Sequence, residues 1–181
     1  MSKLNIKSAL PYIGLPFIIL GLLLLKINQN EPFIILLHCL LAILGYFATV
    51  IDIKSKKIPN SLVLVMITGW IIVTIPQLFL NIETTLIFLR NSLFGFGIGG
   101  GLPLLIYLIS RRGIGGGDVK FMAAAGLYLG IYGVLPAMLY GSILAGLTGI
   151  TLIIIKKIGR KDSIPLAPFL FAGILITVFF M

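Results

Sequence analysis

The sequence predicts an all-α fold: a polytopic membrane helix bundle of about seven transmembrane helices in a single domain. The first observation is composition. Of 181 residues, 59% are hydrophobic and 10% are charged, and the mean hydropathy is +1.17, whereas a soluble domain carries about 25% charged residues. The other two are a series of long apolar runs and an uneven distribution of lysine and arginine. This composition excludes a soluble globular enzyme, a disordered protein and a secreted disulfide scaffold.

The long apolar runs account for the predicted helices. A helix needs about 20 residues to cross the hydrocarbon core of a bilayer. The runs are Ala9–Leu25, Phe33–Ile51, Pro59–Leu80, Leu86–Ile109, Val119–Tyr132, Gly133–Ile155 and Pro165–Met181. The fifth run is short, and a break between Gly130 and Gly133 separates it from the sixth. We expect residues 1–32 to add an N-terminal helix and an outer loop to a six-helix core, residues 33–181.

Small residues at a spacing of four indicate where these helices pack closely. Gly97 and Gly101 have this spacing in the fourth run, and Gly141, Ala145 and Gly149 have it in the sixth. Such spacing lets two helix backbones approach each other inside a membrane. We therefore expect the fourth and sixth helices to make tight contacts with their neighbours.

The basic residues predict the orientation of the bundle. With the amino terminus in the cytoplasm, the segments 3–7, 54–57, 111–120 and 156–161 all face inward, and they hold 12 of the 14 lysines and arginines. This is the distribution that the positive-inside rule describes. We therefore expect a multi-pass protein of the cytoplasmic membrane. Its net charge of +9 predicts contact with anionic lipid rather than with nucleic acid.

The inventory of reactive side chains limits the chemistry. The chain has one histidine, His38, and one cysteine, Cys39. They allow neither an internal disulfide nor a protein-held zinc site, and we expect no metal and no cofactor. His38 precedes Asp52 by 14 residues, about 21 Å along one continuous helix, which excludes a histidine-assisted site there. Ser142 is predicted to lie toward the outer half of the membrane, with no base in reach.

Two carboxylates, Asp52 and Asp118, are predicted at the cytoplasmic ends of apolar runs, where ionisable groups are costly and usually functional. Asp52 begins the segment Asp-Ile-Lys-Ser-Lys-Lys-Ile-Pro-Asn. Asp118 follows Gly-Ile-Gly-Gly-Gly, and these glycines let another backbone approach the carboxylate. Each aspartate also has a structural alternative: Asp118 as a helix N-cap, and Asp52 as a loop acid paired with the neighbouring lysines.

The equal depth of the two aspartates favours a joint function. Carboxylates about 3 Å apart share a proton and can activate water against a peptide carbonyl. Helix dipoles favour Asp118 as the base and Asp52 as the acid, although the lysines beside Asp52 oppose this assignment. An alternative is a small proton- or cation-coupled transporter that uses the same aspartates. Transport sites, however, usually lie at the membrane midplane, where no acid is predicted.

At these residues the sequence resembles the type IV prepilin peptidases, a family of membrane aspartic endopeptidases that includes the preflagellin peptidases. Three stretches carry the resemblance: Asp52–Asn60 with its Ile-Pro-Asn end, Gly115–Lys120 (Gly-Gly-Gly-Asp-Val-Lys) and Ile164–Leu170 (Ile-Pro-Leu-Ala-Pro-Phe-Leu). The resemblance implies that Asp52 and Asp118 are catalytic. It also implies prepilin-like precursors as partners, whose short basic leader is cut after a glycine at the cytoplasmic membrane boundary.

The residues around the pair are expected to bind substrate or to shape the site. They are Gly115, Gly116, Gly117, Lys120, Pro59, Asn60, Pro165 and Pro168. The prolines and Asn60 are expected to shape helix ends. Lys120 is expected to tune the aspartate pair, to bind substrate carbonyls, or to extend to the lipid headgroups.

One departure from the long members of the family bears on the reaction. Those members carry a cytoplasmic insert with paired Cys-x-x-Cys motifs and also methylate the new amino terminus. Here the connection between the first two runs, residues 26–32, is predicted to face outward and has no cysteine. We expect a short form that is a peptidase without N-methyltransferase activity.

Overall fold

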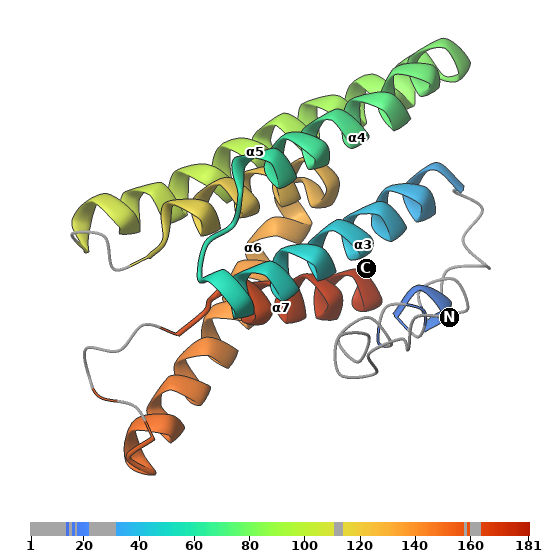
Figure 1. Cartoon of the computed structure of the whole chain (residues 1–181). Coiled ribbons are helices and arrows are strands. Elements are labelled where there is room, and N and C mark those ends of the chain that lie inside the picture. The colour runs from blue at the N-terminus through green and yellow to red at the C-terminus, as the bar shows by residue number, and fades with distance from the viewer. Residues whose placement is uncertain are drawn as a thin grey trace.

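The computed structural model describes residues 14, 16, 18–21, 32–110, 114–157, 159 and 164–181, and these contain helices but no strand. The helices are α3 (Pro32–Ser55), α4 (Asn60–Leu80), α5 (Ile82–Ile109), α6 (Gly116–Ile154) and α7 (Ala167–Phe180) (Figure 1). The first predicted run, Ala9–Leu25, lies largely outside the described residues. The prediction of an all-helical fold is confirmed for the described part of the chain.

Among the described residues, four helices are long and apolar enough to cross a membrane: α3, α4, α5 and α6. The fifth, α7, has 14 residues. Large apolar side chains cover the outside, since Ile72, Phe79 and Ile109 are 70%, 87% and 80% exposed. An outer surface of this kind suits lipid rather than water. The chain is therefore a multi-pass membrane protein.

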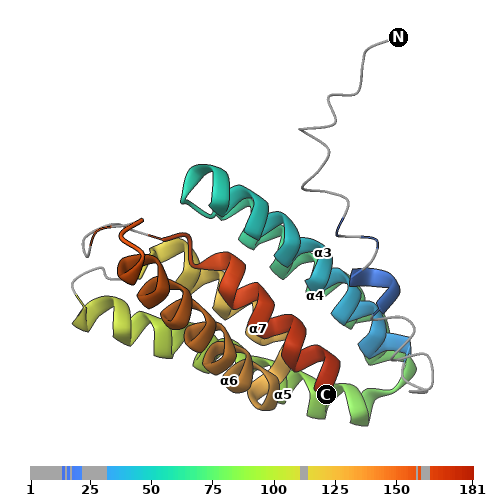
Figure 2. The same cartoon turned by 90° about the horizontal axis from the view of Figure 1, so that it is seen from below.

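The fifth and sixth predicted runs form a single element, α6, which changes direction at Gly130. This glycine has φ 63° and ψ −173°, a backbone conformation that is essentially restricted to glycine. The first half of α6 runs beside α5, and the second half turns back beside α7 (Figures 1 and 2). The predicted break between the fifth and sixth runs is confirmed, because two helical segments meet at the non-helical Gly130.

Glycines bring the backbones of α5 and α6 into direct contact. A Cβ at Gly95 would collide with the Gly126 carbonyl oxygen, and one at Gly99 would collide with the Met122 carbonyl oxygen. Gly97 and Gly101 were predicted to make this close contact, and that prediction was wrong. Both face open space, with nothing within 4 Å of an added Cβ. The spacing of four was read correctly, but the sequence does not say which face of α5 meets α6.

The second half of α6 is packed in the same way against α7. A Cβ at Gly173 would collide with the Ala137 carbonyl oxygen, and one at Gly141 would lie 2.9 Å from the Leu170 Cα. On its other side α7 meets α3, where a Cβ at Gly45 would lie 2.6 Å from the Phe171 ring. The predicted close packing of the sixth run is confirmed at Gly141.

The connection from α3 to α4 is a tight turn in which Lys56 has a left-handed backbone conformation. Lys56 has φ 51°, and its amide donates to the Asp52 carbonyl oxygen over 2.7 Å, which is a common way to end a helix. Pro59, the first residue of the predicted run, is the N-cap of α4, so the helix begins one residue later than predicted. The turn therefore keeps the end of α3 and the start of α4 at one end of the bundle.

We predict that Gly126→Ala destabilises the bundle by about 1–3 kcal/mol, the usual cost of forcing extra atoms into a packed contact. The added methyl group meets the Gly95 backbone, which cannot move as a side chain can. Unfolding by sodium dodecyl sulfate in mixed micelles measures the change in the free energy of unfolding.

The matched control is Gly97→Ala on the same pair of helices. Its methyl group enters open space, so stability should hold or rise by up to about 1 kcal/mol, because alanine is the better helix former. Equal effects of the two substitutions would contradict the packing described here.

Candidate active site

Asp52 lies near the C-terminal end of α3 and is 4% exposed. A buried carboxylate is costly unless it is hydrogen-bonded. Its Oδ2 accepts a hydrogen bond from the Ala167 backbone amide over 3.1 Å. Ala167 is the first residue of α7, so a helix N-terminus, which favours anions, is directed at Asp52. This partner could not be predicted from the sequence, because 115 residues separate the two groups.

The two late prolines lie on either side of that contact. Pro168 is in the first turn of α7, where its missing N–H leaves no helical hydrogen bond unmade. Pro165 lies in the segment that leads into α7. Together they flank Ala167, whose amide remains available to Asp52.

Asp118 lies in the first turn of α6 and is 8% exposed. The N-cap of this helix is Gly115, so the N-cap alternative for Asp118 was wrong. Its Oδ2 lies only 2.8 Å from where a Cβ at Gly115 would be. Its Oδ1 is buried and has no hydrogen-bond partner among the described residues. A buried carboxylate oxygen without a partner costs stability and is typical of a site that meets another molecule.

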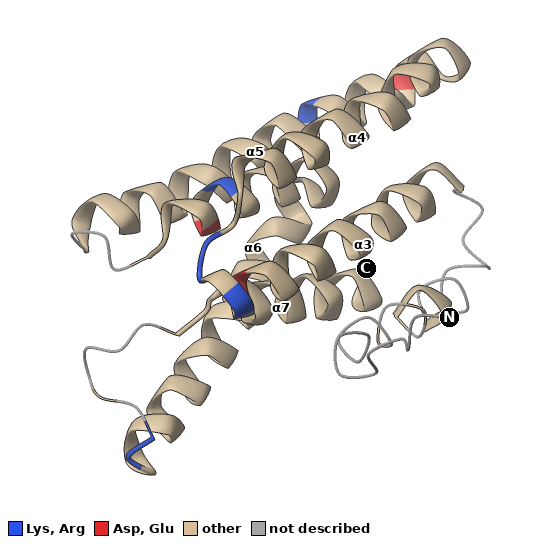
Figure 3. Cartoon of the chain, viewed as in Figure 1, with Lys and Arg blue, Asp and Glu red and all other residues tan. Residues whose placement is uncertain are grey.

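The two aspartates both lie beside the start of α7: Asp52 binds the Ala167 amide, and Asp118 lines a cavity together with Leu166. Figure 3 shows acidic segments at the end of α3 and at the start of α6, on either side of the α3–α4 connection. Each carboxylate lies at a helix N-terminus: α7 for Asp52 and α6 for Asp118. Helix dipoles therefore do not distinguish the base from the acid, contrary to the assignment made from the sequence.

The three glycines before Asp118 have different surroundings. A Cβ at Gly117 would lie 3.1 Å from the Ile58 Cβ and 3.2 Å from the Ile58 backbone nitrogen, so the α3–α4 connection passes close to this loop. Gly115 has room for the Asp118 carboxylate only because it lacks a side chain. Gly116 faces open space. Only two of the three glycines are therefore required by the local packing.

Lys120 and Asn60 bridge α6 and α4 at the same end of the bundle. The Lys120 ammonium Nζ donates to the Asn60 side-chain oxygen over 2.9 Å, and both side chains are exposed. The sequence predicted both residues for the site but did not pair them. The hydrogen bond joins the second turn of α6 to the residue that follows Pro59.

A small cavity of about 40 Å³ lies next to Asp118, with room for about one water molecule. Its walls come from α5, both halves of α6 and the start of α7, and they include Met122, Met138, Ser142 and Leu170. Ser142 was predicted to lie toward the outer half of the membrane with no base in reach, but it lines the same small cavity as Asp118. A substrate peptide does not fit this cavity, so it has to reach the aspartates from an open side or between parting helices.

Other groups lie away from the aspartates. His38 is on the same continuous helix as Asp52, so the separation of about 21 Å applies. A larger cavity, of about 700 Å³, is lined by Phe33 and by the start of α5, about 28 Å along α3 from Asp52. Within the described ranges, no three histidine, cysteine or acidic side chains are placed to hold a metal ion.

Comparison with known proteins places this site in a family. Residues 39–150, more than half of the chain, match the type IV leader peptidase family. The chain belongs to the type IV leader peptidase family. The matched segment contains both Asp52 and Asp118, and the resemblance seen in the sequence is thereby confirmed. Membership of a leader peptidase family does not favour the transporter alternative.

Individual relatives are distant. The chain is 26% identical over 125 residues to the prepilin leader peptidase/N-methyltransferase of Xanthomonas campestris pv. campestris, covering 66% of this chain and 41% of the relative. The proteins of the same name from Bacillus subtilis and Aeromonas hydrophila are 29% and 26% identical over 38% and 67% of the chain. The matches span 28% and 41% of those two relatives. No solved structure matches the chain.

We predict a weak but measurable coupling between Lys120 and Asn60. Because both groups are exposed, a double-mutant cycle of Lys120→Ala and Asn60→Ala should give a coupling of about 0.5 kcal/mol. The free energy of unfolding in mixed micelles is the measurement. Strict additivity of the two substitutions would show that the hydrogen bond is not maintained.

Proposed function

We propose that this type IV leader peptidase is an aspartic endopeptidase that removes the short basic leader of prepilin-like precursors. Support comes from the two buried carboxylates, Asp52 and Asp118, which both lie beside the start of α7 at one end of the bundle. The names of the relatives, which specify prepilin leader peptidases, supply the substrate class.

The hydrolysis needs one ionised and one protonated carboxyl group. The ionised aspartate takes a proton from a water molecule as the water oxygen bonds to the peptide carbonyl carbon, and the protonated one donates to the carbonyl oxygen. When the tetrahedral intermediate collapses, the C–N bond breaks, the leaving amine takes the proton that the first aspartate received from water, and the second aspartate takes a proton back from a hydroxyl of the intermediate. Two buried carboxyls that share one proton meet both requirements at once.

The proposed location of this reaction is the cytoplasmic face of the cytoplasmic membrane. The basic segments support a cytoplasmic amino terminus and a bundle of seven helical spans, in which the two halves of α6 count separately and residues 1–32 supply the first span. The precursor's apolar helix would dock laterally between spans, because its basic leader is repelled by a protein of net charge +9. Methyl transfer is not part of the proposal.

The surrounding residues have supporting roles in this proposal. Gly115 and Gly117 leave space for the Asp118 carboxylate and for the α3–α4 connection, respectively. Lys120 and Asn60 hold α6 to α4. Pro165 and Pro168 shape the start of α7, whose first amide binds Asp52.

We predict that Asp52→Asn and Asp118→Asn each reduce precursor cleavage by about a hundredfold to ten-thousandfold, the range for removing a general acid or base. Purified protein in lipid vesicles is incubated with a prepilin-like precursor, and the shortened product is followed by mass spectrometry. Glu83→Gln, an exposed acid in the first turn of α5, is the control and should cleave normally. Normal cleavage by either aspartate variant would refute the mechanism.

Gly115→Ala is predicted to reduce cleavage by about tenfold or more while leaving the fold intact. The new methyl group would lie 2.8 Å from the Asp118 Oδ2, so the carboxylate has to shift, and small shifts of catalytic groups are costly. The matched control is Gly116→Ala, whose methyl group meets nothing within 4 Å and should change the rate by less than about twofold. Equal rates for the two variants would contradict the predicted role of Gly115.

A further inference from the structure

We propose that Asn91 is a positioning residue that sets the angle between the two halves of α6 and thereby the relative position of Asp118 and Asp52. The proposal rests on the proposed peptidase function. Asn91 lies in the middle of α5, far from both aspartates in sequence, and it had no role in the sequence analysis.

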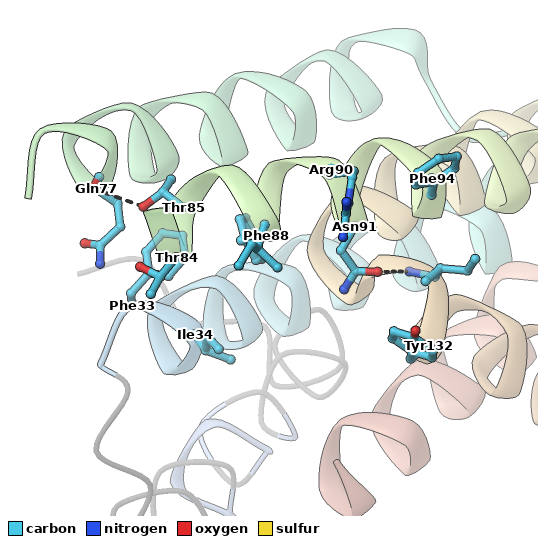
Figure 4. A pocket seen from close by; sticks show the side chains of 12 residues that line it. Phe33, Ile34, Gln77, Thr84, Thr85, Phe88, Arg90, Asn91, Phe94 and Tyr132 are labelled. Carbon is cyan, nitrogen blue, oxygen red and sulfur yellow. Dashed lines mark hydrogen bonds between the residues drawn. The ribbon is translucent and has the colours of Figure 1, made fainter. Parts of the chain in front are cut away.

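The first step is the break itself. Gly130 leaves the helical conformation, so the amide of Ile131 loses its partner in the preceding turn. The Asn91 side-chain oxygen accepts a hydrogen bond from that amide over 3.1 Å (Figure 4). Breaks in a membrane helix are tolerated where side chains satisfy the released backbone groups. Asn91 therefore caps the second half of α6 from a neighbouring helix.

The second step is that Asn91 also fixes Gly130 from the side. A Cβ at Gly130 would lie 2.5 Å from the Asn91 Nδ2 and 2.8 Å from its Cγ. The side chain therefore touches the one residue at which α6 turns and bonds to the next residue. A change in the turn angle has to break or strain both contacts.

The third step is that α5 contacts the turn at two points, since the Gly95 backbone packs against Gly130 in addition to the Asn91 side chain. Asn91 and Ile131 line the larger cavity, of about 700 Å³, between the starts of α3 and α5 and the turn of α6. Figure 4 shows Asn91 and Tyr132 at the wall of this cavity. The hydrogen bond from Ile131 to Asn91 therefore lies at the wall of this cavity.

The fourth step connects the turn to the aspartates. The first half of α6 carries Asp118 and is held against α5 by the contacts of Gly95 and Gly99. The second half is held against α7 by the contacts of Gly141 and Gly173. The first amide of α7 binds Asp52. Each half of α6 is therefore tied to a different aspartate, and the turn between them sets how the two meet.

The test follows the angle between the two halves of α6 through the distance between two spin labels. Spin labels are placed at two exposed positions, by Leu108→Cys on α5 and Ile154→Cys at the end of α6, in a Cys39→Ser background, and their separation is measured by pulsed electron resonance. Ile154 lies about 35 Å along the helix from the turn, so a change of about 5° moves the label by about 3 Å. We expect one narrow distance in the otherwise native protein.

Asn91→Ala should broaden that distance or shift it by about 3 Å or more. It should also lower the cleavage rate at saturating precursor by up to about a hundredfold, with KM changed less than about twofold, because docking of the precursor is not altered. Asn91→Asp retains an oxygen at the same place and should restore both the distance and the rate.

Phe94→Ala is the control, because Phe94 lines the same cavity on the same helix and leaves the bond to Ile131 in place; it should change neither reading. A native distance and rate in Asn91→Ala, or no recovery in Asn91→Asp, would overturn the proposal.

If the unmodified protein does not shorten the precursor at all, the peptidase function fails. The label distances then still decide whether Asn91 fixes the turn.

Discussion

The structure depends on how two carboxylates are buried inside an apolar bundle. A buried carboxylate without partners is too costly to keep, and this chain has few polar groups to offer. It uses the ends of helices instead, with the α7 amide on Asp52 and the first turn of α6 around Asp118. Helix ends are therefore gathered at one end of the bundle, where Pro59 is the N-cap of α4 and Pro168 lies in the first turn of α7.

Glycines make this arrangement possible in two ways. In the middle of the bundle they remove side chains so that helix backbones touch, as at Gly95 and Gly126. Close contact of this kind holds helices together in lipid, where apolar side chains gain little from burial. The second way is conformational: the positive φ of Gly130 lets α6 turn back. The result is two packed groups of helices, each tied to one aspartate.

Much of this could be predicted from the sequence, for identifiable physical reasons. The length of the third apolar run predicted the boundaries of α4 to within one residue. The break near Gly130 was predicted because the apolar stretch 119–155, with 37 residues, is too long for one crossing. Asp52 and Asp118 stand out because acids are rare at the edges of apolar runs. These inferences use local properties of the chain.

The errors arose where the answer depends on which helix faces meet. Gly97 and Gly101 have the same spacing as Gly95 and Gly99, and only the rotation of α5 distinguishes the two pairs. The approach of Ser142 to Asp118 and the Ala167 contact with Asp52 follow from the direction of α6 and α7. Asn91 gave no local signal, because an asparagine in a long apolar run is recognised as a cap only when the broken helix lies beside it.

The central claim is that Asp52 and Asp118 act on one peptide bond. The most direct measurement is the structure of the Asp118→Asn protein in a lipid nanodisc with an uncleaved precursor bound. The claim predicts that both side chains lie within hydrogen-bonding distance, about 3 Å, of the scissile carbonyl or of one water beside it. A precursor bound with its cleavage site out of reach of either side chain, or at the opposite membrane face, would contradict the claim.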